Sequence, residues 1–177
     1  MRYTLALLVQ DRPSVLTHIA GLISRRRYNI KSIAAGATEE PEITRITIVV
    51  DCNEDKVDQV MKQLAKLVDV VKVSDLTATP SITRDMALIK VHALPEKRTQ
   101  IVDIVNIFRA GIVDITKDTM VIEATGEAEK INALCEVMSE HGIIEIARTG
   151  VIAVSRGAVP IKALPYREDG IAADDQR

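Results

Sequence analysis

One order of predicted elements (strand, helix, strand, strand, helix, strand) occurs twice in this chain, over residues 3–76 and over residues 86–147. Each copy can place its four strands in one antiparallel sheet and both of its helices on one face of that sheet. The repeat therefore predicts an α+β fold made of two ferredoxin-like βαββαβ units, each with an antiparallel sheet and helices on one face.

The first copy is predicted from hydrophobic spacing and from turn signals. An apolar strand over 3–9 is followed by Pro13, near which we expect the first helix to begin. Two β-branched strands, 30–38 and 43–51, flank a polar turn and should pair antiparallel, and a short strand over 70–73 completes the copy. The helices are predicted from apolar residues at helical spacing, which are Val15, Ile19, Leu22 and Ile23, and then Val57, Val60, Met61, Leu64 and Leu67.

The second copy shows the same signals. Its strands are predicted over 87–93, 112–116, 120–125 and 143–147. Its helices carry apolar stripes, formed by Ile101, Ile104, Val105 and Phe108 and by Ile131, Leu134, Cys135 and Met138. Gly111 and Gly142 are the residues expected to terminate these helices.

These patterns divide the chain into a first domain at 1–77, a linker at 78–85, a second domain at 86–156 and a tail at 157–177. Residues 151–154 can extend the second sheet. The tail has two prolines, two glycines, a charged end and little apolar periodicity, so it is predicted to be disordered. Several strands are apolar at nearly every position, so we expect dimerisation, through a sheet edge or a sheet face, to cover the faces without helices.

The charge and cysteine content exclude several classes of partner. Net charge at pH 7 is -2, with 23 basic and 25 acidic residues spread through the chain, so no nucleic acid and no membrane partner is expected. The run Leu5–Val9 is too short for a signal-peptide core, and no segment reaches membrane-spanning length. Cys52 and Cys135 lie far apart without a CxxC or Cys/His cluster, which favours a cytoplasmic protein without a metal site.

The ferredoxin-like fold serves RNA-binding modules, metal chaperones, acylphosphatases and amino-acid sensors, so function depends on the site. The strand 44–51 lacks the aromatic residues on which an RNA-binding module stacks bases, and the loop 10–14 lacks the cysteines of a metal carrier. No nucleophile motif surrounds His18, His92 or His141, and no Walker or Rossmann glycine pattern is present. We therefore expect no catalytic residue, no metal and no cofactor in this chain.

The loop between the first strand and the first helix carries the strongest signal of a site, and it reads Asp11-Arg12-Pro13-Ser14-Val15-Leu16. Free N–H groups at the start of a helix can bind a carboxylate, and Asp11 can meet an ammonium group. Together these groups could hold a free amino acid. An alternative fits the loop equally well, in which Asp11 caps the helix and Pro13 starts it without any ligand.

At this loop the chain resembles ACT domains, which are amino-acid-binding regulatory modules whose first loop often reads Asp-x-Pro-Gly-Val-Leu. Further segments, in this order, resemble the small, regulatory subunit of acetolactate synthase (acetohydroxyacid synthase), and the likeness extends from residue 3 to about residue 157. These segments are Arg26-Arg27-Tyr28-Asn29-Ile30, residues 64–73, Ala87-Leu88-Ile89-Lys90-Val91, Ile107-Phe108-Arg109-Ala110 and Glu145-Ile146-Ala147-Arg148-Thr149-Gly150.

The resemblance implies a non-catalytic subunit that raises the activity of a large catalytic subunit and makes it sensitive to valine or another branched-chain amino acid. Thiamine diphosphate, Mg and FAD are then expected on that catalytic partner. By similarity the effector lies between two N-terminal units of a homodimer, where one chain supplies the loop and the other supplies the start of its second strand. The implied effector-binding residues are Asp11, Arg12, Pro13, Ser14, Val15 and Leu16 of the loop, with Asn29 as a polar anchor and Ile30 in the apolar wall.

Two residues depart from the family pattern. Ser14 stands where ACT loops usually have glycine, and Asp11 stands where close members often have asparagine. We expect altered effector affinity, and a Ser14→Gly substitution is expected to strengthen valine binding. Arg109 and Arg148 are candidate contacts with the large subunit.

Two other functions remain as alternatives. The first is a free-standing amino-acid-responsive ACT regulator, for example one that governs transcription, although no helix-turn-helix pattern is visible. The second is a small acylphosphatase-type enzyme, whose anion-binding loop could only be Asp11-Arg12.

Overall fold

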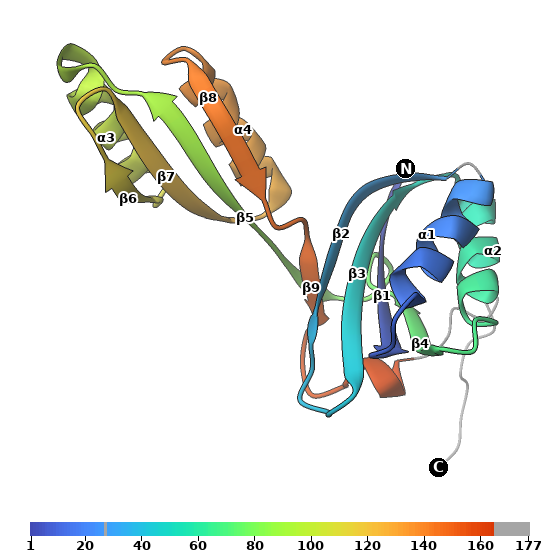
Figure 1. Cartoon of the computed structure of the whole chain (residues 1–177). Helices are drawn as coiled ribbons and strands as arrows, with labels where there is room; N and C mark the ends of the chain where they lie inside the picture. The colour runs from blue at the N-terminus through green and yellow to red at the C-terminus, as the bar shows by residue number, and fades with distance from the viewer. Residues whose placement is uncertain (27, 165–177) are drawn as a thin grey trace. The chain divides into compact units, whose positions relative to one another are not determined.

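The computed structural model describes residues 1–26 and 28–164, and these form two compact units (Figure 1). Unit 1 consists of residues 1–82 together with the segment that starts at Ala153, and unit 2 consists of Thr83–Ile152. The chain therefore leaves unit 1, builds unit 2, and returns to complete unit 1. Each unit contains the predicted βαββαβ order, so the predicted fold is confirmed.

Unit 1 has a four-stranded antiparallel sheet in the order β2-β3-β1-β4. Its elements are β1 (Arg2–Gln10), α1 (Val15–Arg25), β2 (Asn29–Ala37), β3 (Ile43–Asp51), α2 (Glu54–Leu64) and β4 (Val70–Asp75). In Figure 1, α1 and α2 lie side by side against one face of this sheet.

The core of unit 1 follows from alternation along the central strands. Leu5 and Leu7 of β1 and Ile46 and Ile48 of β3 point toward the helices and are fully buried against the apolar stripe of α1 and α2. Burial of each such side chain contributes about 1.5–3 kcal/mol to folding. This stripe contains the predicted apolar residues, with Leu22 at its partly buried edge. Leu67 was predicted on the second helix but lies beyond its end at Leu64, where it still packs on the same core.

The opposite face of this sheet is covered by the end of the chain. Residues 153–164, here called the C-terminal strap, include the end of β9 (Ile152–Ser155) and the short 3₁₀ helix η2 (Ile161–Ala163). A second apolar cluster joins the strap to the sheet, and its buried members are Ala6, Leu8, Leu76, Ala153, Ile161 and Leu164. Part of the face that we expected dimerisation to cover is thus covered by the chain itself.

The predicted domain boundaries need correction. Disorder was expected over 157–177, but residues 157–164 are ordered because Ile161 and Leu164 are buried on the sheet of unit 1; residues 165–177 lie outside the described part. The predicted linker at 78–85 already contains the start of β5 at Ser81.

The strands of unit 2 form a sheet of order β6-β7-β5-β8, and β9 pairs with β5. Its elements are β5 (Ser81–His92), η1 (Pro95–Lys97), α3 (Arg98–Ile107), β6 (Gly111–Ile115), β7 (Thr119–Gly126), α4 (Ala128–Ser139) and β8 (Ile143–Arg148). Alternate residues of β5 and β7 pack on α3 and α4, as predicted. Gly142 has the left-handed backbone expected after α4, whereas Arg109, rather than Gly111, takes that conformation after α3.

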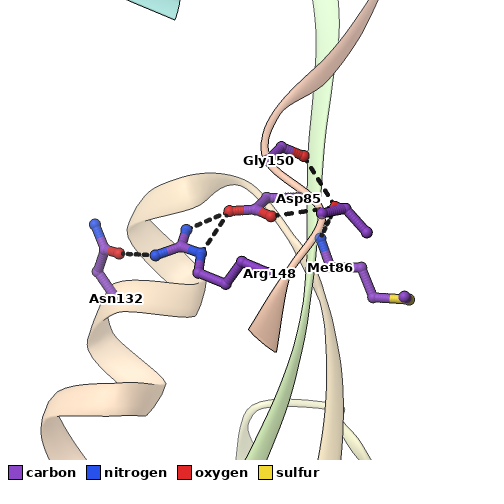
Figure 2. Close-up of polar contacts among 6 residues, drawn as sticks. Asp85, Met86, Asn132, Arg148 and Gly150 are labelled. Atoms are coloured by element: carbon purple, nitrogen blue, oxygen red, sulfur yellow. Dashed lines mark hydrogen bonds and ion pairs between the residues drawn. The ribbon is translucent and has the colours of Figure 1, made fainter. Parts of the chain in front are cut away.

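An ion pair lies at the end of unit 2 where both connecting segments enter it (Figure 2). Arg148 donates from Nε to Oδ2 of Asp85 over 2.8 Å and from Nη1 to Oδ1 of Asn132 on α4 over 2.8 Å. Met86 N–H donates to the Thr149 hydroxyl over 3.1 Å, and Thr149 N–H donates to the Met86 carbonyl over 3.0 Å. Arg148 is therefore held within unit 2, where it anchors the end of β8 to β5 and α4.

We predict that Arg148→Ala lowers the free energy of unfolding by about 3 kcal/mol, because the Asp85 carboxylate would stay buried without its cation. Asp85 is only 2% exposed in its side chain. Urea unfolding followed by circular dichroism measures the loss.

The matched control is Lys90→Ala, which breaks the pair between Lys90 Nζ and Glu145, 3.2 Å apart, whose side chains are 42% and 66% exposed. Exposed pairs contribute little, so a loss below about 1 kcal/mol is expected. Equal losses for the two variants would contradict a buried structural role for Arg148.

Candidate effector site

The β1–α1 loop is tied to two neighbouring turns by backbone hydrogen bonds. Gln10 N–H donates to the Asp69 carbonyl over 2.9 Å, and Asp11 N–H donates to the Glu42 carbonyl over 2.7 Å. Arg12 N–H turns back to the Gln10 carbonyl over 2.9 Å. The loop is therefore held at its first residues by the approach to β4 and by the β2–β3 turn.

Ser14 sets the direction in which the chain enters α1. It is the N-cap residue, with φ 76° and ψ -10°, in the left-handed region that glycine adopts freely. For an ordinary residue this conformation costs roughly 1–2 kcal/mol. Ser14 thus keeps the backbone shape of a glycine loop at a cost in stability.

The helix start differs from both sequence-based expectations. The helix begins at Val15 rather than near Pro13, because the left-handed Ser14 interrupts helical geometry. The N-cap is Ser14 and not Asp11, so the alternative in which Asp11 caps the helix is wrong. Since the Ser14 side chain makes no capping hydrogen bond, it does not satisfy the N–H groups of the first turn, and these remain able to bind an anion.

An open cavity of about 240 Å³ lies at this loop. Its walls combine loop backbone, polar side chains and apolar side chains from β1, β3 and α1. The lining residues are Val9, Gln10, Asp11, Arg12, Pro13, Ser14, Val15, Leu16, Thr17, Thr44 and Ile46. The structure therefore brings all of the predicted loop residues to one small cavity, with Asp11 exposed and Leu16 49% exposed at its rim.

The remaining predicted residues, Asn29 and Ile30, do not line this cavity in the same chain. Asn29 is exposed at the start of β2 and pairs in register with Asp51. Ile30 is partly buried against the helix-side core. Their expected contact with an effector depends on a second copy of the chain and stays a prediction.

Asp69 supports the β1–α1 loop, although it does not line the cavity and was not predicted from the sequence. Its side chain is 15% exposed, and its carboxylate oxygens lie 3.9 Å from Arg12 Nη1 and 3.7 Å from His18 Nδ1. It therefore lies behind the loop and attracts the Arg12 side chain. No local motif marks this aspartate, because its role depends on the pairing of β4 with β1.

The residues around the cavity show no arrangement for nucleophilic catalysis. In the described part of the chain, no hydrogen bond joins the Ser14 hydroxyl to His18, whose Nδ1 instead lies 3.7 Å from Asp69 Oδ2. Burial raises the pKa of the Cys52 and Cys135 thiols, which disfavours reactive thiolates. Within residues 1–26 and 28–164, no group of three or more His, Cys, Asp or Glu side chains could hold a metal ion, and no helix could cross a membrane.

Two family models match most of the chain. The AHAS small subunit-like ACT domain matches residues 5–72, and the small subunit of acetolactate synthase matches residues 84–157. Both matches agree with the resemblance noted in the sequence.

Individual proteins give the same result. The chain is 48% identical over 157 residues to a probable acetolactate synthase small subunit of Archaeoglobus fulgidus, covering 89% of this chain and 98% of the relative. It is 46% identical over 155 residues to the acetolactate synthase small subunit of Mycolicibacterium smegmatis, covering 88% of this chain and 91% of the relative.

A solved structure extends this agreement to the fold. The crystal structure of the acetolactate synthase small subunit from Thermotoga maritima superposes with a TM-score of 0.82 at 36% identity, covering 90% of this chain and 99% of the other. The chain therefore belongs to the family of acetolactate synthase small, regulatory subunits and carries their ACT domain.

Proposed function

We propose that this chain binds valine, or another branched-chain amino acid, at the β1–α1 loop and regulates an acetolactate synthase large subunit. The observation that carries the proposal is the uncapped start of α1 beside a small cavity with one carboxylate and an apolar wall. In a chain of this family, these features provide a partner for each part of a branched-chain amino acid.

Each part of the ligand has a matching group. The effector carboxylate would accept hydrogen bonds from the N–H groups of Leu16 and Thr17 in the first turn of α1, where the helix dipole is positive. Its ammonium group would meet the exposed carboxylate of Asp11. A branched aliphatic side chain would then pack on the apolar lining of the cavity, which includes Val9, Leu16 and Ile46.

A homodimer would complete this site. β2 is an edge strand of the unit 1 sheet, and most of its residues are exposed, including Ile33 at 41%. An open strand edge of this kind can pair with the same strand of a second copy. In such a dimer, Asn29 and Ile30 of one copy would contact the effector held by the loop of the other.

Catalysis would take place on the large subunit. That partner would hold thiamine diphosphate, Mg and FAD, and this chain would hold no cofactor and act by changing the large subunit's activity. Both subunits would work in the cytoplasm. Effector binding and large-subunit binding would be coupled by roughly 1–3 kcal/mol, and linkage requires the same factor in both directions.

We predict that this chain stimulates acetolactate formation from pyruvate by its matching large subunit, and that valine reverses the stimulation. Leu16→Asp places a carboxylate where the effector carboxylate and side chain should lie, so this variant should stimulate but should resist valine. Acetolactate formation is measured with and without the chain and over a range of valine concentrations.

The results of this assay separate the two parts of the proposal. Stimulation without valine sensitivity would retain the partnership and reject valine as the effector. No stimulation by the wild-type chain would reject the regulatory partnership and favour a free-standing amino-acid-responsive regulator.

We further predict that Ser14→Gly binds valine more tightly than the wild type does. Its free energy of unfolding should be about 0.5–1 kcal/mol higher than that of the wild type, because glycine removes the left-handed strain. Calorimetric titration measures affinity, and urea unfolding measures stability. Ser14→Ala is the control: it keeps the strain and removes no capping hydrogen bond, so its stability should match that of the wild type. Unchanged valine affinity in Ser14→Gly would show that Ser14 does not tune the site.

A further inference from the structure

The C-terminal strap is fixed to the β2–β3 turn as well as to the sheet. The Lys162 ammonium pairs with the Glu40 carboxylate in this turn, and the two side chains are 46% and 43% exposed. Arg45, just beyond the turn, donates from Nη2 to the Ala153 carbonyl over 2.6 Å. Burial lowers the pKa of Arg45, and the nearby Glu39 carboxylate opposes this shift. The strap therefore contacts both the turn itself and the first residues of β3.

The same turn holds the effector loop. Glu42 has a left-handed backbone, with φ 64°, and its carbonyl accepts the 2.7 Å hydrogen bond from Asp11 N–H. Glu40 lies two positions earlier, and two hydrogen bonds hold its backbone in the turn. Glu40 N–H donates to Thr38 Oγ1 over 3.2 Å, and Ile43 N–H donates to the Glu40 carbonyl over 3.3 Å. A displacement of Glu40 would thus be transmitted to the residue that holds Asp11.

The central strands provide a second connection between strap and cavity. Ile43 packs on the strap cluster from one face of β3, and its neighbour Thr44 lines the cavity. In β1, Leu8 packs on the strap cluster and its neighbour Val9 lines the cavity. Because successive residues of a strand point to opposite faces, the strap lies behind the strands that form the cavity wall.

We infer that the C-terminal strap positions the effector loop, with Lys162 and Glu40 as positioning residues. This inference rests on the proposed function, because it concerns the affinity of the same effector site. Ile161 and Leu164 dock the strap by burial of apolar surface, and the Lys162–Glu40 pair fixes the turn against it. The helix-side core of unit 1 contains none of these residues, so loosening the strap should change the site without unfolding that core.

Calorimetric titration of the full chain with valine tests the inference. Lys162→Glu, which opposes two carboxylates, should weaken valine binding by about two- to fivefold, the range that corresponds to an exposed ion pair. Lys162→Arg should retain wild-type affinity. The exchange Lys162→Glu with Glu40→Lys should restore it, because the ion pair can form again with its charges reversed.

Release of the whole strap should have a larger effect. Ile161→Asp places a charge in the buried strap cluster, and we expect at least about tenfold weaker valine binding. Circular dichroism at the titration temperature checks that the sheet and helices remain folded.

Lys56→Glu is the matched control. It makes the same charge change on an exposed residue of α2, which makes no ion pair among residues 1–26 and 28–164, so its affinity should equal that of the wild type. If the wild type binds valine, and Lys162→Glu and folded Ile161→Asp bind it with the same affinity, the inference is wrong while the proposed function stands. Absence of valine binding by the wild-type chain would overturn the proposed effector, and the inference with it.

Discussion

The strand β1 is apolar on both of its faces, and this constraint determines how the rest of unit 1 is arranged. Leu5 and Leu7 require a cover on one side of the sheet, and Ala6 and Leu8 require a cover on the other. The helices α1 and α2 cover the first side. The second side is covered by residues 153–164. These residues follow unit 2 in the sequence, so unit 1 is complete only when the chain returns to it.

This arrangement places the β1–α1 loop between two supports. The loop leaves β1 at Gln10, is bonded to the β2–β3 turn through Glu42, and enters α1 through the left-handed Ser14. The β2–β3 turn is itself held to the strap by the ion pair between Glu40 and Lys162. A regulatory site on such a loop can respond to changes elsewhere in the chain, because its shape depends on contacts that the loop does not itself contain.

The sequence predicted the features that depend on short-range patterns. Alternation and helical spacing located the strands and helices, and the family motif contains the loop residues 11–16 that lie at the cavity, whereas Thr44 and Ile46 of its wall were not predicted. The left-handed Ser14 was not predicted, because the residue type does not favour that backbone. The strap was missed because Ile161 and Leu164 follow no periodic pattern, and their burial depends on Ala6, Leu8 and Leu76, which lie far earlier in the chain. Asp69 and the Asp85–Arg148 pair depend in the same way on strand pairing.

The central claim, that two copies of the chain share each effector site, is tested most directly by mixing two deficient variants. Leu16→Asp damages the loop contribution and Asn29→Ala damages the contribution of the second copy, so each variant alone should bind little valine. After co-refolding in equal amounts, mixed dimers should contain one undamaged site, and calorimetry should recover about a quarter of the wild-type number of sites. Recovery of no sites in dimers shown to be mixed would contradict a shared site and would place the whole effector site within one chain.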